Sequence, residues 1–100
     1  MNNDDLYQEI GAFVTEAFPD ATPREHIRKM IQEGYEVMED PFMLDEYADC
    51  AIALFGACHK AGFCFSDLMS AVAEKFTVIK GRKWERLPDG TYQHIKEESK

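Results

Sequence analysis

The spacing of apolar residues along the chain predicts four helices. Apolar positions three or four apart fall on one face of a helix, and four such stripes are separated by short segments containing Gly, Pro or Asp. Thr22 and Pro23 mark the start of the second stripe, because Thr is a good N-cap and Pro fits the first helical position. The predicted helices cover about residues 4–17, 23–39, 43–60 and 65–79. Four helices joined by short loops predict an all-α, four-helix bundle-like fold.

The two later stripes and the tail add detail to this fold. The stretch CAIALFGAC, residues 50–58, is apolar on every face, which predicts a helix buried on all sides. The fourth predicted helix is expected to turn its apolar stripe inward, with Leu68, Met69, Val72, Ala73, Phe76 and Ile79. Beyond Gly81, a Pro-Asp-Gly turn predicts a short hairpin or an irregular C-terminal arm.

Length and composition bound the class of protein. With 100 residues and 45% hydrophobic content, the chain is expected to form one domain over residues 1–100 with a modest core, so a second copy is an expected partner. No apolar run approaches the roughly 20 residues that span a membrane. The acidic start MNNDDLYQEIG lacks the features of a signal peptide, and three cysteines without a CxxC pair fit a reducing compartment. We therefore expect a cytoplasmic protein.

Charge is distributed unevenly along the chain. With 11 basic and 19 acidic residues the formal net charge is −8, which argues against a nucleic-acid polymer as partner because such binders need a basic surface. Residues 1–49 hold 13 acids and 3 bases, whereas residues 50–100 hold 6 acids and 8 bases. The bases concentrate in KGRKWER, residues 80–86. An acidic and a basic segment in one chain suit joint binding of a metal ion and a polyphosphate. They equally fit ordinary attraction between opposite charges within the fold.

Seven acids and no base lie in EGYEVMEDPFMLDEYAD, residues 33–49. Glu33 and Glu36 are three residues apart, as are Glu46 and Asp49, so on helices each pair shares one face. The pairs are also symmetric about Pro41: the inner acids lie five residues from it and the outer acids eight. In an antiparallel helical hairpin that turns near Pro41, the four carboxylates are therefore expected to converge.

Two explanations of these acids stay open on the residues alone. Convergent carboxylates repel one another unless a cation is bound, and hard oxygen ligands suit Mg²⁺ or Mn²⁺. Alternatively the acids form a solvated surface, and those at 45–49 favour the dipole of the helix they begin. The dipole does not explain the acids at 33–40, which lie toward a helix C-terminus. The geometry therefore favours a divalent-metal site.

The acidic pairs EGYE and EYAD together resemble the ExxE…ExxD pattern of the MazG-type all-α NTP pyrophosphohydrolases. The resemblance covers about residues 8–96 and is greatest to the short dATP/dGTP-directed members found in phage genomes. It also rests on the stretches TPREHIRKMIQEGYEV, DEYADCAIALFGACHKAGF, AVAEKFTVIKGRKW and DGTYQHIKE.

The resemblance implies a Mg²⁺-dependent enzyme, with Mn²⁺ as a substitute cofactor. It implies conversion of a (d)NTP, with purine dNTPs such as dGTP or dATP favoured, to the monophosphate and pyrophosphate by metal-activated water attack on the α-phosphate. The implied metal ligands are Glu33, Glu36, Glu46 and Asp49, of which the first two are also the implied catalytic residues. The implied substrate-binding residues are Lys75, Arg82, Lys83 and Trp84. Family habit also implies a homodimer or homotetramer, with a phage-encoded copy acting in the host cytoplasm.

Two positions depart from the family pattern. Gln32 stands where members commonly have a further Glu, so a general-base role falls to Glu33 or Glu36. Ile79 stands where members usually have an Asn, which leaves recognition of base and sugar open. These departures keep an alternative function under consideration, a non-catalytic acidic protein that engages a nucleotide or a basic host factor.

Four further residues have weaker assignments. His26 and Lys29 lie two turns and one turn before Glu33 near its helix face. Contact with a substrate phosphate stays open for both, and surface positions are the preferred interpretation. Trp84 suits stacking on a base, but packing against the core or an interface is the preferred interpretation. His94 reaches a substrate only if the tail folds back.

Overall fold

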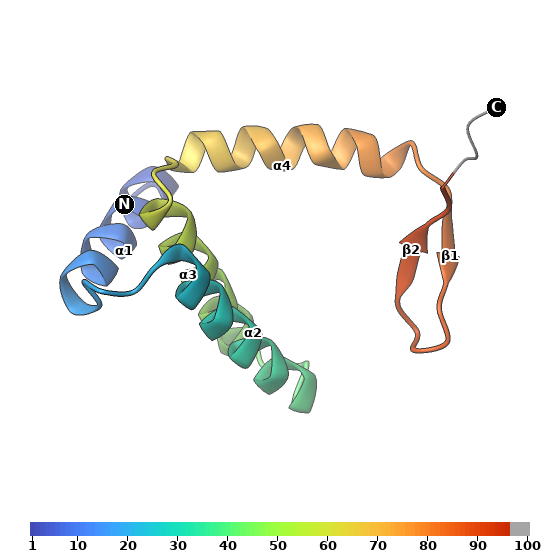
Figure 1. The fold of residues 1–100 in the computed structure, drawn as a ribbon, viewed down its shortest axis with the longest axis horizontal. Coiled ribbons are helices and arrows are strands. Elements are labelled where there is room, and N and C mark those ends of the chain that lie inside the picture. Colours follow the sequence, from blue (N-terminus) through green and yellow to red (C-terminus); the bar gives the residue numbers. More distant parts are fainter. Residues whose placement is uncertain (97–100) are drawn as a thin grey trace. The chain divides into compact units, whose positions relative to one another are not determined.

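The computed structural model describes residues 1–96 and confirms the predicted all-α class, its four helices and the hairpin in the arm. The elements are α1 (Asn3–Ala17), α2 (Pro23–Glu39), α3 (Leu44–Lys60), α4 (Phe65–Lys80), β1 (Trp84–Arg86) and β2 (Tyr92–His94) (Figure 1). They fall into two compact units, Met1–Leu68 and a second that begins at Met69. The prediction of a single domain stays a prediction. No single helix within residues 1–96 is long and apolar enough to cross a membrane; only α3 and α4 as a broken pair have that length and composition.

Side-chain caps fix where α1 and α2 begin. The side chain of Asn2 accepts a hydrogen bond from the backbone N–H of Asp5 at 2.8 Å, and Thr22 Oγ1 accepts one from the backbone N–H of Glu25 at 3.3 Å. Each bond satisfies one of the backbone donors that a helix start leaves free. The predicted N-cap at Thr22 and the start at Pro23 are thus confirmed.

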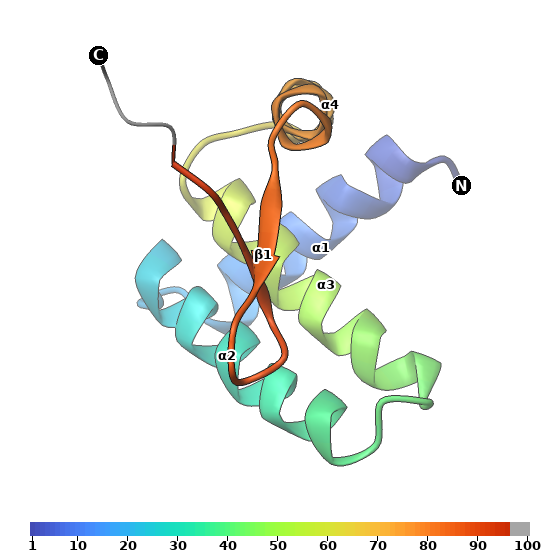
Figure 2. The ribbon, with the colours of Figure 1, turned by 90° about the vertical axis from the view of Figure 1, so that its right-hand side faces the viewer.

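In the first unit, α2 and α3 form an antiparallel hairpin and α1 packs on α3. The two hairpin helices lie side by side in both ribbon views (Figure 1 and Figure 2). The core is centred on Tyr7, Val14 and Ala57. Tyr7 is 1% exposed, and its hydroxyl donates to the Phe63 carbonyl oxygen at 2.6 Å. This buried ring ties α1 to the residues that follow α3.

The structure corrects the prediction that the middle of α3 is buried on all sides. Gly56 and Ala57 are buried, but Ile52 is 45% and Leu54 37% exposed. Within this unit α3 packs against α1 and α2, and two neighbouring helices cannot enclose a third. An apolar circumference therefore predicted more burial than two neighbours supply.

The inward stripe predicted for α4 is also wrong for the chain as described. No residue of Phe65–Lys80 is buried. The stripe residues Met69, Val72, Phe76 and Ile79 are each at least 40% exposed. The helical spacing was read correctly from the sequence, but helical spacing does not show which surface covers the stripe.

The second unit ends in a two-stranded antiparallel hairpin. Residues 84–86 of β1 pair with residues 94–92 of β2, with Glu85 opposite Gln93. Gly90 adopts a φ of 90° in the connecting turn, which L-residues rarely adopt. The Leu87 N–H donates to the Thr91 carbonyl oxygen at 2.7 Å and closes this turn. The Pro-Asp-Gly turn predicted from the sequence is therefore present.

Candidate functional site

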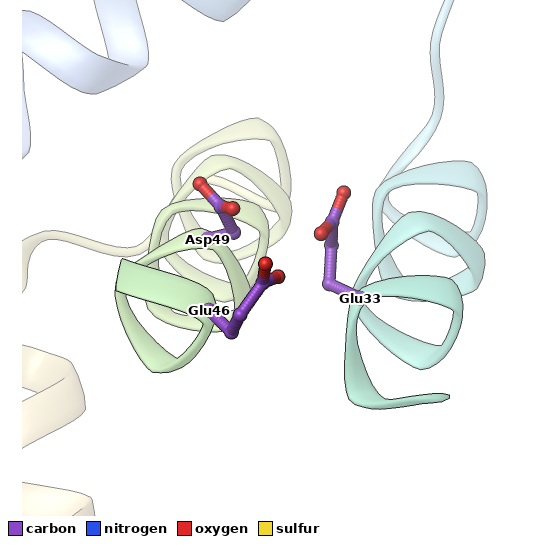
Figure 3. A group of neighbouring side chains, drawn as sticks. All are labelled: Glu33, Glu46 and Asp49. Carbon is purple, nitrogen blue, oxygen red and sulfur yellow. The ribbon is translucent and has the colours of Figure 1, made fainter. Parts of the chain in front are cut away.

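Three of the four predicted acids converge between α2 and α3. Glu33 comes from α2, and Glu46 and Asp49 come from α3, with their side chains directed toward one another (Figure 3). One carboxylate oxygen from each lies within 4.8 Å of the others. The sequence produces this meeting because the hairpin turns at Pro41 and the two helices run antiparallel, so residues at matched distances from the turn face each other.

Glu33 is held in place by a basic neighbour. Lys29 Nζ lies 3.0 Å from Glu33 Oε1, one helical turn away, and only 12% of the Glu33 side chain is exposed. The hydrogen bond from Lys29 is the main cause that lowers the pKa of Glu33. Glu33 therefore stays ionised, as a metal ligand must. The surface position predicted for Lys29 is confirmed, since 61% of its side chain is exposed, but its ion pair with Glu33 was not predicted.

Glu46 has an unsatisfied oxygen beside this pair. Its Oε2 is buried and has no hydrogen-bond partner within residues 1–96. A buried acceptor without a partner costs free energy, so such an atom calls for a ligand. Carboxylate oxygens are the ligands that Mg²⁺ and Mn²⁺ prefer. Glu33, Glu46 and Asp49 thus fit a divalent cation in both chemistry and spacing.

Glu36 lies beside this cluster but is not one of its three members. Its pKa is raised because its carboxyl group shares a hydrogen bond with Glu33 and because the charges of Glu33 and Glu46 are near. Burial and the neighbouring acids also raise the pKa of the Cys50 thiol. Both effects show that negative charge is concentrated at this end of the hairpin.

A cavity of about 410 Å³ adjoins the acids in the first unit. Glu33 and Asp49 belong to its lining, and most other lining residues are apolar. His26 also lines it and is 7% exposed, so the predicted surface position of His26 is wrong. Positions 26 and 33 share a helix face at a spacing of seven residues, so the sequence places His26 near the acids but does not show that its side chain is buried.

The predicted substrate-binding residues all lie in the second unit. Arg82 and Lys83 line a hollow of about 740 Å³ together with His94 and Lys96. Lys75 lies exposed on α4. Trp84 begins β1, and its indole N–H donates to the Ile79 carbonyl oxygen at 3.1 Å while its ring contacts His94 edge-on. The residues predicted to bind substrate thus belong to the second unit, whereas the acids belong to the first.

The fold and the acids define an all-α protein whose helical hairpin can hold divalent cations. A solved structure of this class is similar: the cyanophage S-2L MazG-like pyrophosphohydrolase, bound to dGDP and three catalytic Mn²⁺ ions per active site. The two share 26% sequence identity with a TM-score of 0.77, over 96% of this chain and 99% of that one.

Sequence comparison defines the family. Residues 6–100 match the model of the dATP/dGTP pyrophosphohydrolase family, and the chain belongs to that family. A dATP/dGTP diphosphohydrolase of Salmonella phage PMBT28 is 36% identical over 92 residues, which are 91% of this chain. The match covers 31% of that relative, so the chain spans about a third of its length.

Proposed function

We propose that this protein is a Mg²⁺-dependent pyrophosphohydrolase of nucleoside triphosphates, with purine dNTPs such as dGTP and dATP as its preferred substrates. The products are the monophosphate and pyrophosphate. The observation that carries the proposal is the cluster of Glu33, Glu46 and Asp49 within 4.8 Å, with a buried Glu46 oxygen that has no partner within residues 1–96. Family membership and the nucleotide and Mn²⁺ ions bound by the cyanophage protein support it.

The acids of the α2–α3 hairpin have different roles in this proposal. Bound divalent cations supply charge neutralisation at the triphosphate and a lowered pKa for water. Glu33, Glu46 and Asp49 hold the cations, and Lys29 keeps Glu33 oriented and ionised. Glu36 lies next to Glu33 outside the three-residue group, so it is free either to complete the ligand set or to accept the proton of the attacking water.

The basic residues of the second unit are proposed as ligands of the substrate's phosphates. Arg82 suits bidentate hydrogen bonding to a phosphate, and Lys83 shares its hollow. Lys75 on α4 is proposed as a further phosphate ligand. Trp84 is already engaged by Ile79 and His94, so we assign it to positioning the basic segment. A cytoplasmic location remains part of this proposal.

Turnover of individual nucleotides tests the proposed activity. The purified protein is incubated with each of the dNTPs and NTPs plus Mg²⁺ or Mn²⁺, and monophosphate and pyrophosphate are quantified. Release of both products in equal amounts, fastest with dGTP or dATP, is expected. A protein that turns over none of these nucleotides with either metal is not a pyrophosphohydrolase, and the non-catalytic alternative then replaces the proposal.

Metal binding is expected to raise the melting temperature of the protein. Ligands that bind only the folded state stabilise it, by about 2.7 kcal/mol when the ligand is at 100 times its Kd. Adding Mn²⁺ or Mg²⁺ therefore raises Tm in a scanning fluorimetry or circular dichroism melt, whereas NaCl at matched ionic strength raises it less. An equal response to NaCl would show that screening of exposed acids, rather than a metal site, explains the effect.

The exposed stripe on α4 supports the proposal of a homodimer or homotetramer. Met69, Val72, Phe76 and Ile79 are spaced by three and four residues, the pattern with which helices pack on one another. An exposed apolar stripe of this kind marks an interaction surface, and a second copy of the chain brings the same stripe to meet it.

Light scattering after gel filtration tests this assembly. The wild-type protein is expected to elute with the mass of two or four chains, and Val72→Glu is expected to shift it toward the monomer. Ser70→Glu, which places the same charge on the opposite side of α4, is the matched control and should leave the mass unchanged. A monomeric wild type at micromolar concentration contradicts the assembly.

A further inference from the structure

We propose that the cavity beside the acid cluster is the nucleobase subsite and that His26 is the residue that reads the base. This inference rests on the function proposed above and extends it to the other end of the substrate. The cavity volume of about 410 Å³ lies within the range of pockets that bind small molecules. Its position next to Glu33 and Asp49 fits a ligand whose phosphates lie at the acids and whose base lies among apolar side chains.

Aromatic side chains form one wall of this cavity. Phe13 and Phe18 both line it, and their rings meet edge-to-face with centroids 5.9 Å apart. Lys60 Nζ donates to the Phe18 and Pro19 carbonyl oxygens at 3.3 and 3.4 Å, which ties the end of α1 to α3. Since every nucleobase has a flat π face, exposed rings held in this way provide a stacking surface.

His26 supplies the polar group that an apolar cavity needs for recognition. It is 7% exposed, and its Nε2 has no hydrogen-bond partner among the described residues. Its ring lies edge-on to the ring of Phe18, with the two ring centroids 6.5 Å apart. An imidazole nitrogen donates or accepts according to tautomer, so a base edge with a complementary atom satisfies it and a base without one leaves it buried and unpaired.

The size and lining of the cavity favour the nucleoside over other occupants. Ile52 and Ala53 of α3 and Val14 of α1 complete apolar walls on which a phosphate has no partner. The polar lining residues are Glu25 beside His26, and Lys29, which pairs with Glu33, together with the two cluster acids. A ligand that is flat and apolar at one end and highly charged at the other matches this division, and a purine dNTP has that form.

Binding of nucleoside monophosphates separates this inference from the proposed activity. Titration calorimetry with dGMP, dAMP, dCMP and dTMP, in the presence of Mn²⁺, measures the affinity of each base without turnover. His26→Phe keeps an aromatic ring and removes both nitrogens. It is expected to weaken binding of the preferred purine about 5- to 150-fold, because an atom of the base edge loses its hydrogen-bond partner. Binding of the other three nucleotides should change less, so the discrimination between bases falls.

Two further variants distinguish a loss of base recognition from a folding defect caused by the change at buried His26. Ala53→Leu places a larger side chain in the cavity and is expected to weaken all four nucleotides while the Mn²⁺-dependent rise in Tm is kept. Arg24→Gln, at an exposed position of α2 that does not line the cavity, is expected to bind all four like wild type.

Each outcome bears on one of the two proposals. The first case is a wild-type protein that hydrolyses dNTPs and two variants that both show the Mn²⁺-dependent rise in Tm. If His26→Phe and Ala53→Leu then bind nucleotides with wild-type affinities and base preference, the base subsite lies elsewhere and the inference is overturned. If the wild type shows no turnover but binds dGMP or dAMP in a way that both variants weaken, the subsite stands and the proposed activity does not. Absence of any nucleotide binding overturns the inference.

Discussion

Glu46→Gln is expected to reduce the rate of dNTP hydrolysis by at least about 100-fold, because cation binding contributes several kcal/mol of charge stabilisation in the transition state. Glu46 has a buried carboxylate oxygen without a partner within residues 1–96, and it lies in the cluster with Glu33 and Asp49. Gln keeps the shape of the side chain but loses its charge. The measurement is pyrophosphate release at saturating Mg²⁺, and Asp49→Asn should behave in the same way.

A matched control distinguishes the site from the general acidity of the hairpin. Glu39→Gln removes one negative charge from an exposed position at the end of α2, outside the cluster. It is expected to hydrolyse dNTPs at close to the wild-type rate. Without metal, Glu46→Gln should unfold at a denaturant concentration no lower than wild type, since one of several mutually repelling charges is gone. An active Glu46→Gln protein, or an equally inactive Glu39→Gln protein, contradicts the assignment.

Gly11→Ala is expected to destabilise the fold by about 1–3 kcal/mol, the usual cost of overpacking a core. Gly11 is buried in α1, and a Cβ there overlaps the imidazole ring of His59 on α3. The His59 ring also packs against the ring of buried Tyr7, with the ring centroids 5.9 Å apart, so a shift of His59 disturbs that packing. Urea unfolding followed by circular dichroism measures the loss.

Gly34→Ala is the matched control for this prediction. Gly34 lies within α2, and a Cβ there has no atom within 4 Å among the described residues. Since Gly inside a helix is less stable than Ala by roughly 0.5–1 kcal/mol, this variant should be neutral or more stable. Adding His59→Ala to Gly11→Ala should recover part of the loss, as a double-mutant cycle would show. Equal effects of the two Gly→Ala changes would contradict close packing at Gly11.

The sequence predicted the elements and the acid cluster because both depend on local rules. Thr22, Pro23 and Pro41 mark helix boundaries through backbone geometry, and two pairs of acids symmetric about a turn must meet if the helices run antiparallel. Glu36 lies outside the group of three within 4.8 Å, but its carboxyl group interacts with Glu33 and Glu46, so its part in the ligand set stays a prediction.

Burial was harder to predict because it depends on what packs against each face. His26 resembled a surface residue in sequence, but it is buried, with the Phe18 ring and Gly56 of α3 as neighbours. The middle of α3 and the stripe of α4 showed the opposite error, since apolar residues were expected to be covered and remain exposed. The sequence pattern shows which face of a helix is apolar. Burial of that face depends on neighbouring helices or, as we propose for α4, on a second chain.

Hydrolysis of dGTP in oxygen-18-labelled water with Mg²⁺ shows which phosphorus the water attacks. One labelled oxygen is expected in dGMP and none in pyrophosphate, because the proposed reaction is attack of a metal-activated water on the α-phosphorus. Mass spectrometry of the two products distinguishes the positions. Label in pyrophosphate, release of inorganic phosphate with dGDP, or no turnover of dGTP and dATP would contradict the account.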